Sequence, residues 1–405
     1  MAKRRDTILV IAKGYRQVGS RQLAPSFMSG VLSKLRRDES IKPIVLSFDD
    51  TSDVELREDL PDAEPRIVRL GSSSTVKGTS RTGSDFESWS EWAKVPLTKD
   101  ILYRSTTFAR IGREVASLLP ALSVVHWLEP LAPWNATMNY FLKSRGVKSY
   151  MTIFSLHKRY PAHYALLRMT LAGLEKVVVT TAGLQQVLSK DVGVPFRDTV
   201  RIPLGVDLEL YKPCEDKPSA KRRLGISPDH KVFSWFGPIE PCTRRDFCCV
   251  LNAAQYVHER FPASFFIFAF KNGIPSKVGP CGDWVRFYQG LRHIRDILSA
   301  TDAIILPFSR RSWQRGLPLT IVEALASGVP VITTKRGGLD ETITDGFNGL
   351  LVQEPEDVCQ AALTLCEAKG KLDEMSRNAR LVAERRFDLN AVVQAYVDLW
   401  DGSKT

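Results

Sequence analysis

Residues 317–352 limit most strongly what this chain can fold into. Their hydrophobic pattern predicts a short helix, a tight turn, a buried strand, a glycine loop, a second helix and a closing strand. Pro318 suits the first helical position, where its missing N–H costs nothing, and Gly328 suits the left-handed residue that ends a helix. Helices that alternate with buried strands in this way are typical of α/β domains.

The ends of these elements favour an anionic ligand. The backbone N–H groups of Gly316 and Leu317 would point out of the N-terminus of the first helix, which stabilises an anion such as a diphosphate. Gly337 and Gly338 follow the strand and let a ligand approach the main chain. Glu323 lies inside the first helix among apolar neighbours, which indicate burial, and a buried carboxylate rarely lacks a partner.

The same stretch resembles the signature segment of the retaining family 4 glycosyltransferases, which use nucleotide-sugar donors. The matching positions are Gly316, Glu323, Ala324, Ala326, Gly328, Pro330, Gly337, Gly338, Glu341, Asp345, Gly346, Gly349 and Val352. So many fixed positions in one segment make a specific signal. One position departs, because the family's first acidic residue is Arg315 here. Residues 201–213 are similar to the family's interdomain segment and retain its Gly-Val-Asp at residues 205–207.

Apolar runs alternate with helix-period segments along most of the chain, as expected of parallel sheets wrapped by helices. The expected strands are residues 7–12, 43–48, 66–70, 123–127, 149–154, 176–181, 199–202, 231–236, 264–270, 284–288, 303–307, 329–334 and 350–352. We therefore expect an α/β fold with two doubly wound Rossmann-like domains, residues 1–212 and 213–386. The resemblance implies the GT-B arrangement, in which these domains face each other across a cleft. It assigns the donor to the C-terminal domain, the acceptor to the N-terminal one, and a final helix in residues 387–405 that crosses back.

Composition places the chain among ordinary soluble proteins. Its 405 residues, 44% hydrophobic and 25% charged, can form two domains with full cores. No apolar run approaches the roughly 20 residues that span a bilayer. The seven cysteines are odd in number and form no C-x-x-C motif, so neither a disulfide framework nor a zinc site is predicted. We expect a cytoplasmic location.

The charge is uneven, with a net value of +11 and nine Lys or Arg against one Asp in residues 1–37. No nucleic-acid motif accompanies this charge, so nucleic acid is not an expected partner. Residues 21–37 combine an apolar stripe with basic residues, which fits a helix on an anionic membrane surface. The alternative is that this stripe packs against the first sheet, as the first helix of an α/β domain must.

Donor binding is expected from the C-terminal half. Glu323 can accept hydrogen bonds from both ribose hydroxyls, as its family counterpart does. The family's phosphate-binding Arg is replaced by Pro238, and Arg244 and Arg245 could take over this role or be ordinary helix-start charges. Phe287 and Tyr288 stand where the family holds the nucleobase; this is a positional assignment, and it includes their neighbours in residues 287–290.

Three residues are candidates for catalysis. Arg315 cannot accept the sugar hydrogen bonds of the family's Glu, so it either grips the diphosphate or pairs with a carboxylate; the alternative is a solvated loop arginine. His126 and His157 are expected at strand ends that face the cleft, where either could orient an acceptor hydroxyl. His157 follows its strand two or three residues later than the family spacing, and a histidine satisfied by local main chain is the alternative for both.

The sequence as a whole favours a glycosyltransferase that moves a sugar from a nucleotide-sugar donor to a carbohydrate, lipid-linked or small-molecule acceptor. The resemblance implies retention of configuration and catalysis without a metal or other cofactor. Two alternatives stay open. One is a GT-B scaffold or binding subunit that has lost catalysis, and the other is a GT-B sugar-nucleotide epimerase, which would need acid and base carboxylates around the sugar.

Overall fold

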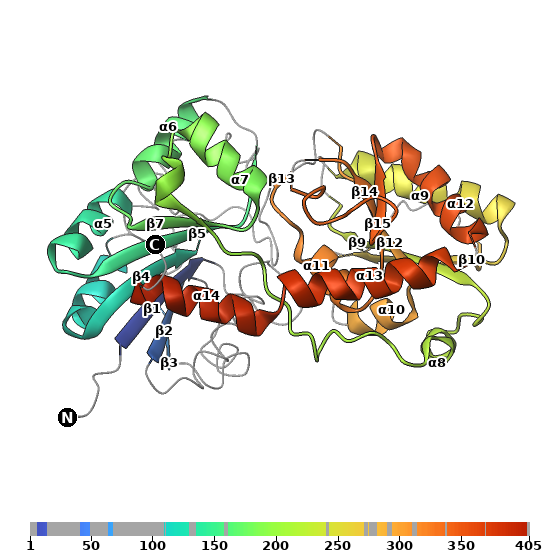
Figure 1. Cartoon of the computed structure of the whole chain (residues 1–405), viewed down its shortest axis with the longest axis horizontal. Helices are drawn as coiled ribbons and strands as arrows, with labels where there is room; N and C mark the ends of the chain where they lie inside the picture. Colours follow the sequence, from blue (N-terminus) through green and yellow to red (C-terminus); the bar gives the residue numbers. More distant parts are fainter. Residues whose placement is uncertain are drawn as a thin grey trace, which may run out of the picture.

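Two parallel β-sheets, each with helices packed on it, and a short antiparallel ribbon make up the protein in the computed structural model (Figure 1). The structure describes residues 6–13, 41–48, 64–67, 109, 111–128, 135–157, 161–239, 243–270, 274, 282–289, 294–309, 314–336, 338–368 and 370–402. Both sheets have the strand crossovers of doubly wound domains, so the expected α/β fold with two Rossmann-like domains is confirmed.

The first sheet has seven parallel strands in the order β3-β2-β1-β4-β5-β7-β8. They are β1 (Asp6–Lys13), β2 (Ile41–Phe48), β3 (Glu64–Ile67), β4 (Leu122–Leu128), β5 (Lys148–Ile153), β7 (Lys176–Val179) and β8 (Thr199–Arg201). The helices that accompany it are α5 (Asn135–Ser144), α6 (Pro161–Thr170) and α7 (Ala182–Val187), and α7 continues into the π-helical turn η2 (Leu188–Val192). Every strand that the sequence predicts in this half is present among the described residues.

The second sheet has six parallel strands in the order β11-β10-β9-β12-β14-β15. They are β9 (Lys231–Gly237), β10 (Ser264–Phe270), β11 (Val285–Gln289), β12 (Ala303–Leu306), β14 (Val331–Thr334) and β15 (Gly349–Val352). Its helices are α8 (Lys217–Arg223), α9 (Arg244–Arg260), α10 (Ile294–Ala300), α11 (Leu319–Ala326), α12 (Val358–Glu367) and α13 (Lys371–Arg386). All residues of β10 are buried, as expected of a central strand covered on both faces.

The last helix, α14 (Leu389–Asp401), leaves the second domain and packs on the first sheet (Figure 1). The chain crosses between the domains twice, and the two crossings touch: Val206 donates its N–H to the carbonyl of Phe387 (2.8 Å) and accepts from Leu389 (3.1 Å). Leu389 also lies directly against Gly205. The linker and the start of α14 therefore form one paired segment between the domains.

One predicted element is wrong. Residues 339–342, expected in a second helix after the glycine loop, form only turns, in which Thr342 and Ile343 donate to the carbonyl of Leu339. Asn348 stabilises the turn that follows by accepting from the N–H of Thr344 (2.7 Å), and β15 begins at the next residue. Among the described residues, no helix is long and apolar enough to cross a bilayer.

Candidate functional site

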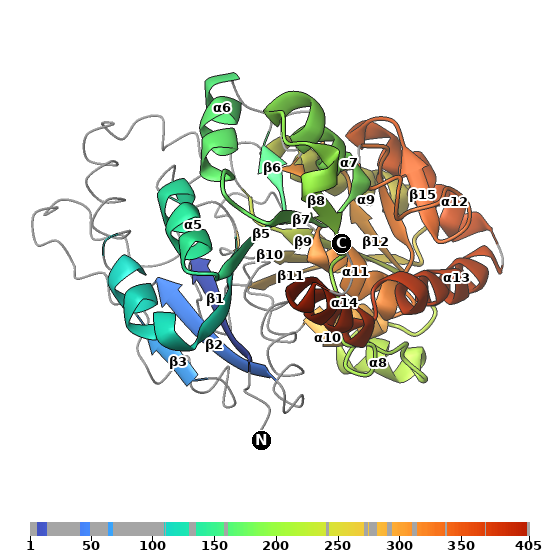
Figure 2. The same ribbon diagram turned by 60° about the vertical axis from the view of Figure 1, so that its left-hand side comes forward.

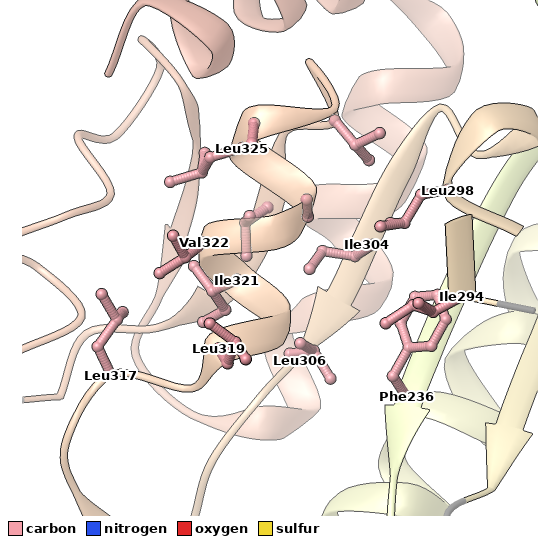
Figure 3. Close-up of a cluster of buried hydrophobic side chains, with 14 of the residues drawn as sticks. Phe236, Ile294, Leu298, Ile304, Leu306, Leu317, Leu319, Ile321, Val322 and Leu325 are labelled. Carbon is pink, nitrogen blue, oxygen red and sulfur yellow. The ribbon is translucent and has the colours of Figure 1, made fainter. Parts of the chain in front are cut away.

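Helix α11 is the centre of the candidate site. Every one of its residues except Thr320 is buried, because the helix is apolar on all faces and lies between the sheet and its neighbours. Figure 3 shows its leucine, isoleucine and valine side chains packed with those of β12 and α10. Pro318 is its N-cap and not its first helical residue, and no described side chain caps the N-terminus. Gly328 has the predicted left-handed conformation (φ +67°).

Glu323 is the only charged residue of α11 and is 3% exposed, so the predicted burial is confirmed. The hydroxyl of Tyr211 donates a hydrogen bond to Oε1 of Glu323 at 2.6 Å. Tyr211 lies in the interdomain linker and is itself buried. A charge-assisted hydrogen bond of this length is a strong one, and it connects the linker to the residue expected to bind ribose.

Gly316 lies where the two domains touch. A Cβ atom at this position would overlap the carbonyl oxygen of Phe154 and come within 3.0 Å of the Cβ of Ser155, so only glycine fits. Leu317, the next residue, is buried. The glycine that the sequence assigned to an anion site thus also allows two backbones from different domains to approach closely.

The same contact brings two of the catalytic candidates together. The short strands β6 (Leu156–His157; labelled in Figure 2) and β13 (Gln314–Arg315; labelled in Figure 1) pair antiparallel across the domain boundary. Gln314 lies opposite His157, and Arg315 lies opposite Leu156. We call this pair of strands the interdomain ribbon. It places the backbones of His157 and Arg315 on neighbouring strands, just before the N-terminus of α11.

The expectation that His126 faces the cleft is wrong. His126 lies within β4, where side chains alternate between the two faces of the sheet, and it points with Val124 and Leu128 to the face that α14 covers. It is fully buried. The indole N–H of Trp400 donates to its Nδ1 (2.9 Å), and its Nε2 lies 2.7 Å from the hydroxyl of Thr152.

These two contacts fix the tautomer of His126. Because Nδ1 accepts from Trp400, the ring proton is on Nε2 and is donated to Thr152. Burial lowers the pKa of His126 to about 3, so the ring is neutral at ordinary pH. With both nitrogens occupied, the histidine serves the packing of α14 and not the binding of an acceptor.

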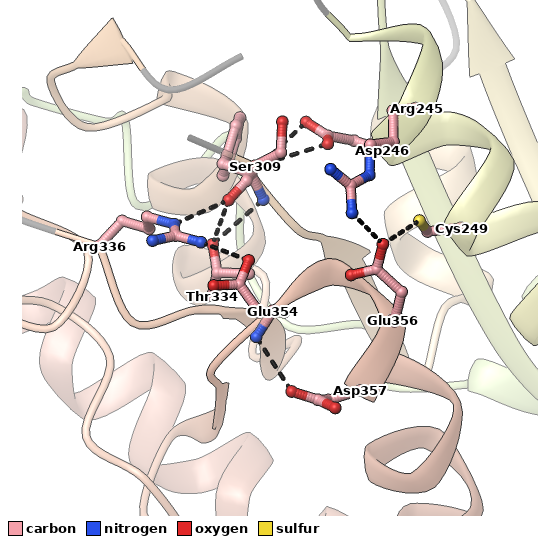
Figure 4. Close-up of polar contacts among 10 residues, drawn as sticks. Arg245, Asp246, Cys249, Ser309, Thr334, Arg336, Glu354, Glu356 and Asp357 are labelled. Atoms are coloured by element: carbon pink, nitrogen blue, oxygen red, sulfur yellow. Dashed lines mark hydrogen bonds and ion pairs between the residues drawn. The ribbon is translucent and has the colours of Figure 1, made fainter. Parts of the chain in front are cut away.

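The arginines expected on the diphosphate begin α9. Both Arg244 and Arg245 are exposed, and Arg245 donates to the carboxylate of Glu356 at 2.7 Å (Figure 4). This hydrogen bond is the main reason why the pKa of Glu356 is lowered. Arg245 would have to leave Glu356 to reach a phosphate, whereas Arg244 has no such bond among the described contacts.

Buried polar contacts organise the loops beside these arginines. The carboxylate of Asp246, which is 2% exposed, accepts the N–H of Ser309 through both oxygens at 3.2 Å and so joins the start of α9 to the loop after β12. Arg336, two residues after β14, donates to the carbonyl of Phe308 (3.1 Å) and to Glu354 (2.7 Å) (Figure 4). The carboxyl ends of β12 and β14 are thereby held in place. Among the described residues, no group of three or more His, Cys, Asp or Glu side chains could hold a metal ion.

The remaining predicted residues lie on the edge strand β11 of the second sheet and in the loop after β14. Phe287 and Tyr288 are half-buried on the edge strand β11, where Phe287 packs on Phe268 and Phe270 of β10. Gly338 has a positive φ of +98° and approaches Thr181 of the first domain, while Gly337 lies outside the described residues.

Sequence reasoning missed the roles of two residues. The carboxylate of Glu341 accepts the N–H groups of Ala182 (2.8 Å) and Gly183 (2.6 Å), and so binds the N-terminus of α7 in the other domain. Tyr211 binds Glu323. Both residues lie in segments that carry the family resemblance, but a sequence pattern does not say which side chains meet across a domain boundary.

Comparisons with known proteins agree with this geometry. Residues 230–368 match the model of the family described as glycosyl transferases group 1. The chain is 30% identical over 219 residues to D-inositol 3-phosphate glycosyltransferase 2 of Catenulispora acidiphila, and the aligned region covers 49% of each chain. It is 25% identical over 219 residues to the lipopolysaccharide core biosynthesis mannosyltransferase LpsB of Rhizobium meliloti, covering 49% of this chain and 59% of that one. The chain thus spans about half the length of the curated relatives it matches.

Solved structures resemble the whole chain. The Anabaena protein HepE in complex with UDP superposes with a TM-score of 0.69 at 16% identity, covering 98% of this chain and all of that one. Sucrose-phosphate synthase of Thermosynechococcus elongatus gives a TM-score of 0.72 at 18% identity, covering 98% and 99%. These likenesses establish the GT-B fold of two Rossmann-like domains, and within that fold residues 230–368 match the model of the group 1 glycosyl transferases.

Proposed function

We propose that this protein transfers a sugar from a nucleotide-sugar donor to a carbohydrate, lipid-linked or small-molecule acceptor, with retention of configuration. One observation carries the proposal: the match to the group 1 glycosyltransferases includes α11, whose single carboxylate, Glu323, is buried beside the domain boundary. HepE binds UDP and UDP-glucose in its crystal structures, which makes a UDP-sugar the first donor to test.

Donor binding would use α11 and the loop before it. Glu323 would accept the ribose hydroxyls, since a carboxylate has acceptor sites for both. The N-terminus of α11, which no described side chain caps, would stabilise the diphosphate together with Arg315 and the arginines of α9. Phe287 and Tyr288, on the edge strand of the same sheet, would hold the nucleobase.

The reaction would take place beside the interdomain ribbon. The bond between the anomeric carbon and the diphosphate oxygen breaks, and the acceptor oxygen forms its bond to that carbon on the same face of the sugar. The departing diphosphate takes the acceptor proton, while cationic groups stabilise its charge. His157 would orient the acceptor, because the ribbon places its backbone on the strand next to that of Arg315 where the domains meet, and closure of the domains would exclude water. This scheme needs no metal.

The acceptor side would lie on the first domain, and residues 21–37 would bring that domain to an anionic membrane when the acceptor is lipid-linked. Their structure lies outside the described residues, so this part of the proposal rests on their sequence of basic and apolar residues. The expected location is cytoplasmic, at the inner face of the membrane.

A panel of UDP-, GDP- and ADP-sugars, tested by calorimetry and by release of nucleoside diphosphate, examines the proposed function. We expect one donor to bind and to be hydrolysed or transferred, with full activity in the presence of EDTA. Glu323→Gln should weaken donor binding about tenfold, because a neutral amide is a poorer acceptor for hydroxyl groups. Binding without turnover would point to the scaffold alternative, interconversion of free nucleotide sugars to the epimerase, and activity that requires added metal would contradict the mechanism.

A further inference from the structure

We propose that Tyr211 of the interdomain linker is a positioning residue, which orients the carboxylate of Glu323 for recognition of the nucleotide's ribose hydroxyls. The inference rests on the proposed function, because it takes Glu323 as the group that binds ribose. It adds a residue outside residues 230–368, the part that matches the family model.

The contact between the two side chains is short and shielded from water. The Tyr211 hydroxyl donates to Oε1 of Glu323 at 2.6 Å, with Tyr211 7% and Glu323 3% exposed. A hydroxyl–carboxylate bond in such surroundings is stronger than one at the surface. A carboxylate only accepts, so the bond fixes one acceptor direction of Oε1 and thereby sets the plane in which the remaining lone pairs lie. A diol can be bound in bidentate fashion only when that plane is held.

Tyr211 is itself held by backbone contacts. Its N–H donates to the carbonyl of Asp207 (3.0 Å), which closes a turn in the linker. Nη1 of Arg380 in α13 donates to the carbonyls of Tyr211 (3.2 Å), Leu208 (3.0 Å) and Ala326 (2.8 Å). Since Ala326 is the last residue of α11, Arg380 fixes the distance between the linker and the helix that carries Glu323. The backbone that carries the Tyr211 side chain is thus held in place relative to Glu323.

A phenylalanine would fill the same space without the donor, so Tyr211→Phe removes the hydroxyl that binds Glu323 and keeps the ring. The experiment compares the affinity for the nucleoside diphosphate that binds best among UDP, GDP and ADP with the affinity for its 2′-deoxy form, measured by calorimetry. We expect the wild-type protein to favour the ribonucleotide at least about tenfold, because an unpaired buried acceptor is costly. Tyr211→Phe should reduce this preference about fivefold, and so should Glu323→Gln. The double variant should show no further loss, since the two groups act together.

Tyr150→Phe is the matched control. Tyr150 is another buried tyrosine with one hydroxyl hydrogen bond, to the carbonyl of Leu399 (3.2 Å), but it lies under α14 in the other domain. The Tyr150→Phe substitution should leave the preference for the ribonucleotide over its 2′-deoxy form unchanged.

The outcomes separate this inference from the proposed function. A wild-type preference for ribose that Tyr211→Phe leaves intact, or an equal loss of affinity for both nucleotides, overturns the positioning role while the proposed function stands. A wild-type protein that binds no nucleoside diphosphate, or that does not distinguish the two sugars, overturns the ribose role of Glu323 and the inference with it.

Discussion

Single residues in this protein show that the same pattern in sequence can serve either ligand binding or packing. Glu323 was expected to be buried and is, yet the partner that accounts for its burial is a tyrosine of the linker. His126 was expected at a strand end that faces the cleft, and α14 covers it instead. No local signal distinguishes these cases, because the deciding partners, Tyr211 for Glu323 and Trp400 for His126, lie more than 100 residues away in the sequence.

Arg315 is the residue whose change should matter most for activity. We expect Arg315→Glu to reduce kcat/KM about 100-fold, because the substitution replaces a cation beside the proposed diphosphate with an anion. The measurement is steady-state transfer or donor hydrolysis with the best donor. Arg385→Glu, at an exposed position of α13, makes the same change of charge away from the site and should have little effect. Full activity in Arg315→Glu would remove this residue from the mechanism.

The buried His126 predicts how stability depends on pH. Its pKa of about 3 lies below the 6.5 of an unfolded histidine, so the unfolded chain takes up a proton first as the pH falls. The free energy of unfolding should therefore fall from pH 6.5 towards pH 3, with about 2 kcal/mol lost by pH 5 through this residue.

Urea unfolding at pH 7 and pH 5 measures this loss. His126→Gln keeps polar atoms in place but does not titrate, and its stability should change less between the two values. An equal change in the variant and the wild-type protein would assign the pH dependence to other groups.

At the scale of elements, the strands were predicted well and the connections less so. A parallel sheet buries its strands on both faces, so each strand appears as an apolar run that can be recognised without knowing its neighbours. The turns at residues 339–342 were predicted as a helix because their composition allows one, but Asn348 accepts the N–H of Thr344 and the chain turns into β15 instead. The interdomain ribbon could not be predicted either, since two-residue strands carry no periodic signal.

Gly316→Ala tests whether that ribbon matters. The added methyl group would collide with the carbonyl of Phe154, so β13 and β6 could not keep their present distance. We expect kcat/KM to fall at least about tenfold, because small displacements near a reacting centre are costly, and small-angle scattering to show a more extended molecule.

The control for this change is Gly346→Ala. Its methyl group would meet no atom within 4 Å, although the left-handed backbone (φ +75°) makes it mildly destabilising. It should leave the domain arrangement as it is. A Gly316→Ala protein with unchanged kinetics and scattering would show that the ribbon is dispensable.

At the scale of the whole molecule, the basic charge is a testable property. If residues 21–37 lie on an anionic surface, the protein should float with vesicles that contain phosphatidylglycerol and not with pure phosphatidylcholine, and added salt should release it. Replacing Lys34, Arg36 and Arg37 by Glu should abolish flotation, whereas the same replacement of Arg222, Arg223 and Arg385 should not. Unchanged flotation of the first variant would favour the alternative that this stripe packs in the core.

The return of α14 to the first sheet also affects how the protein is made. The groups that bind His126 and Tyr150 belong to residues 396–400 of α14, after the second domain. The strands of the first domain are synthesised early, but α14, which packs on them, is synthesised only after the second domain. The core of the first domain is therefore complete only after α14 has been synthesised. A stop codon shortly before residue 389 would damage the domain that was synthesised first.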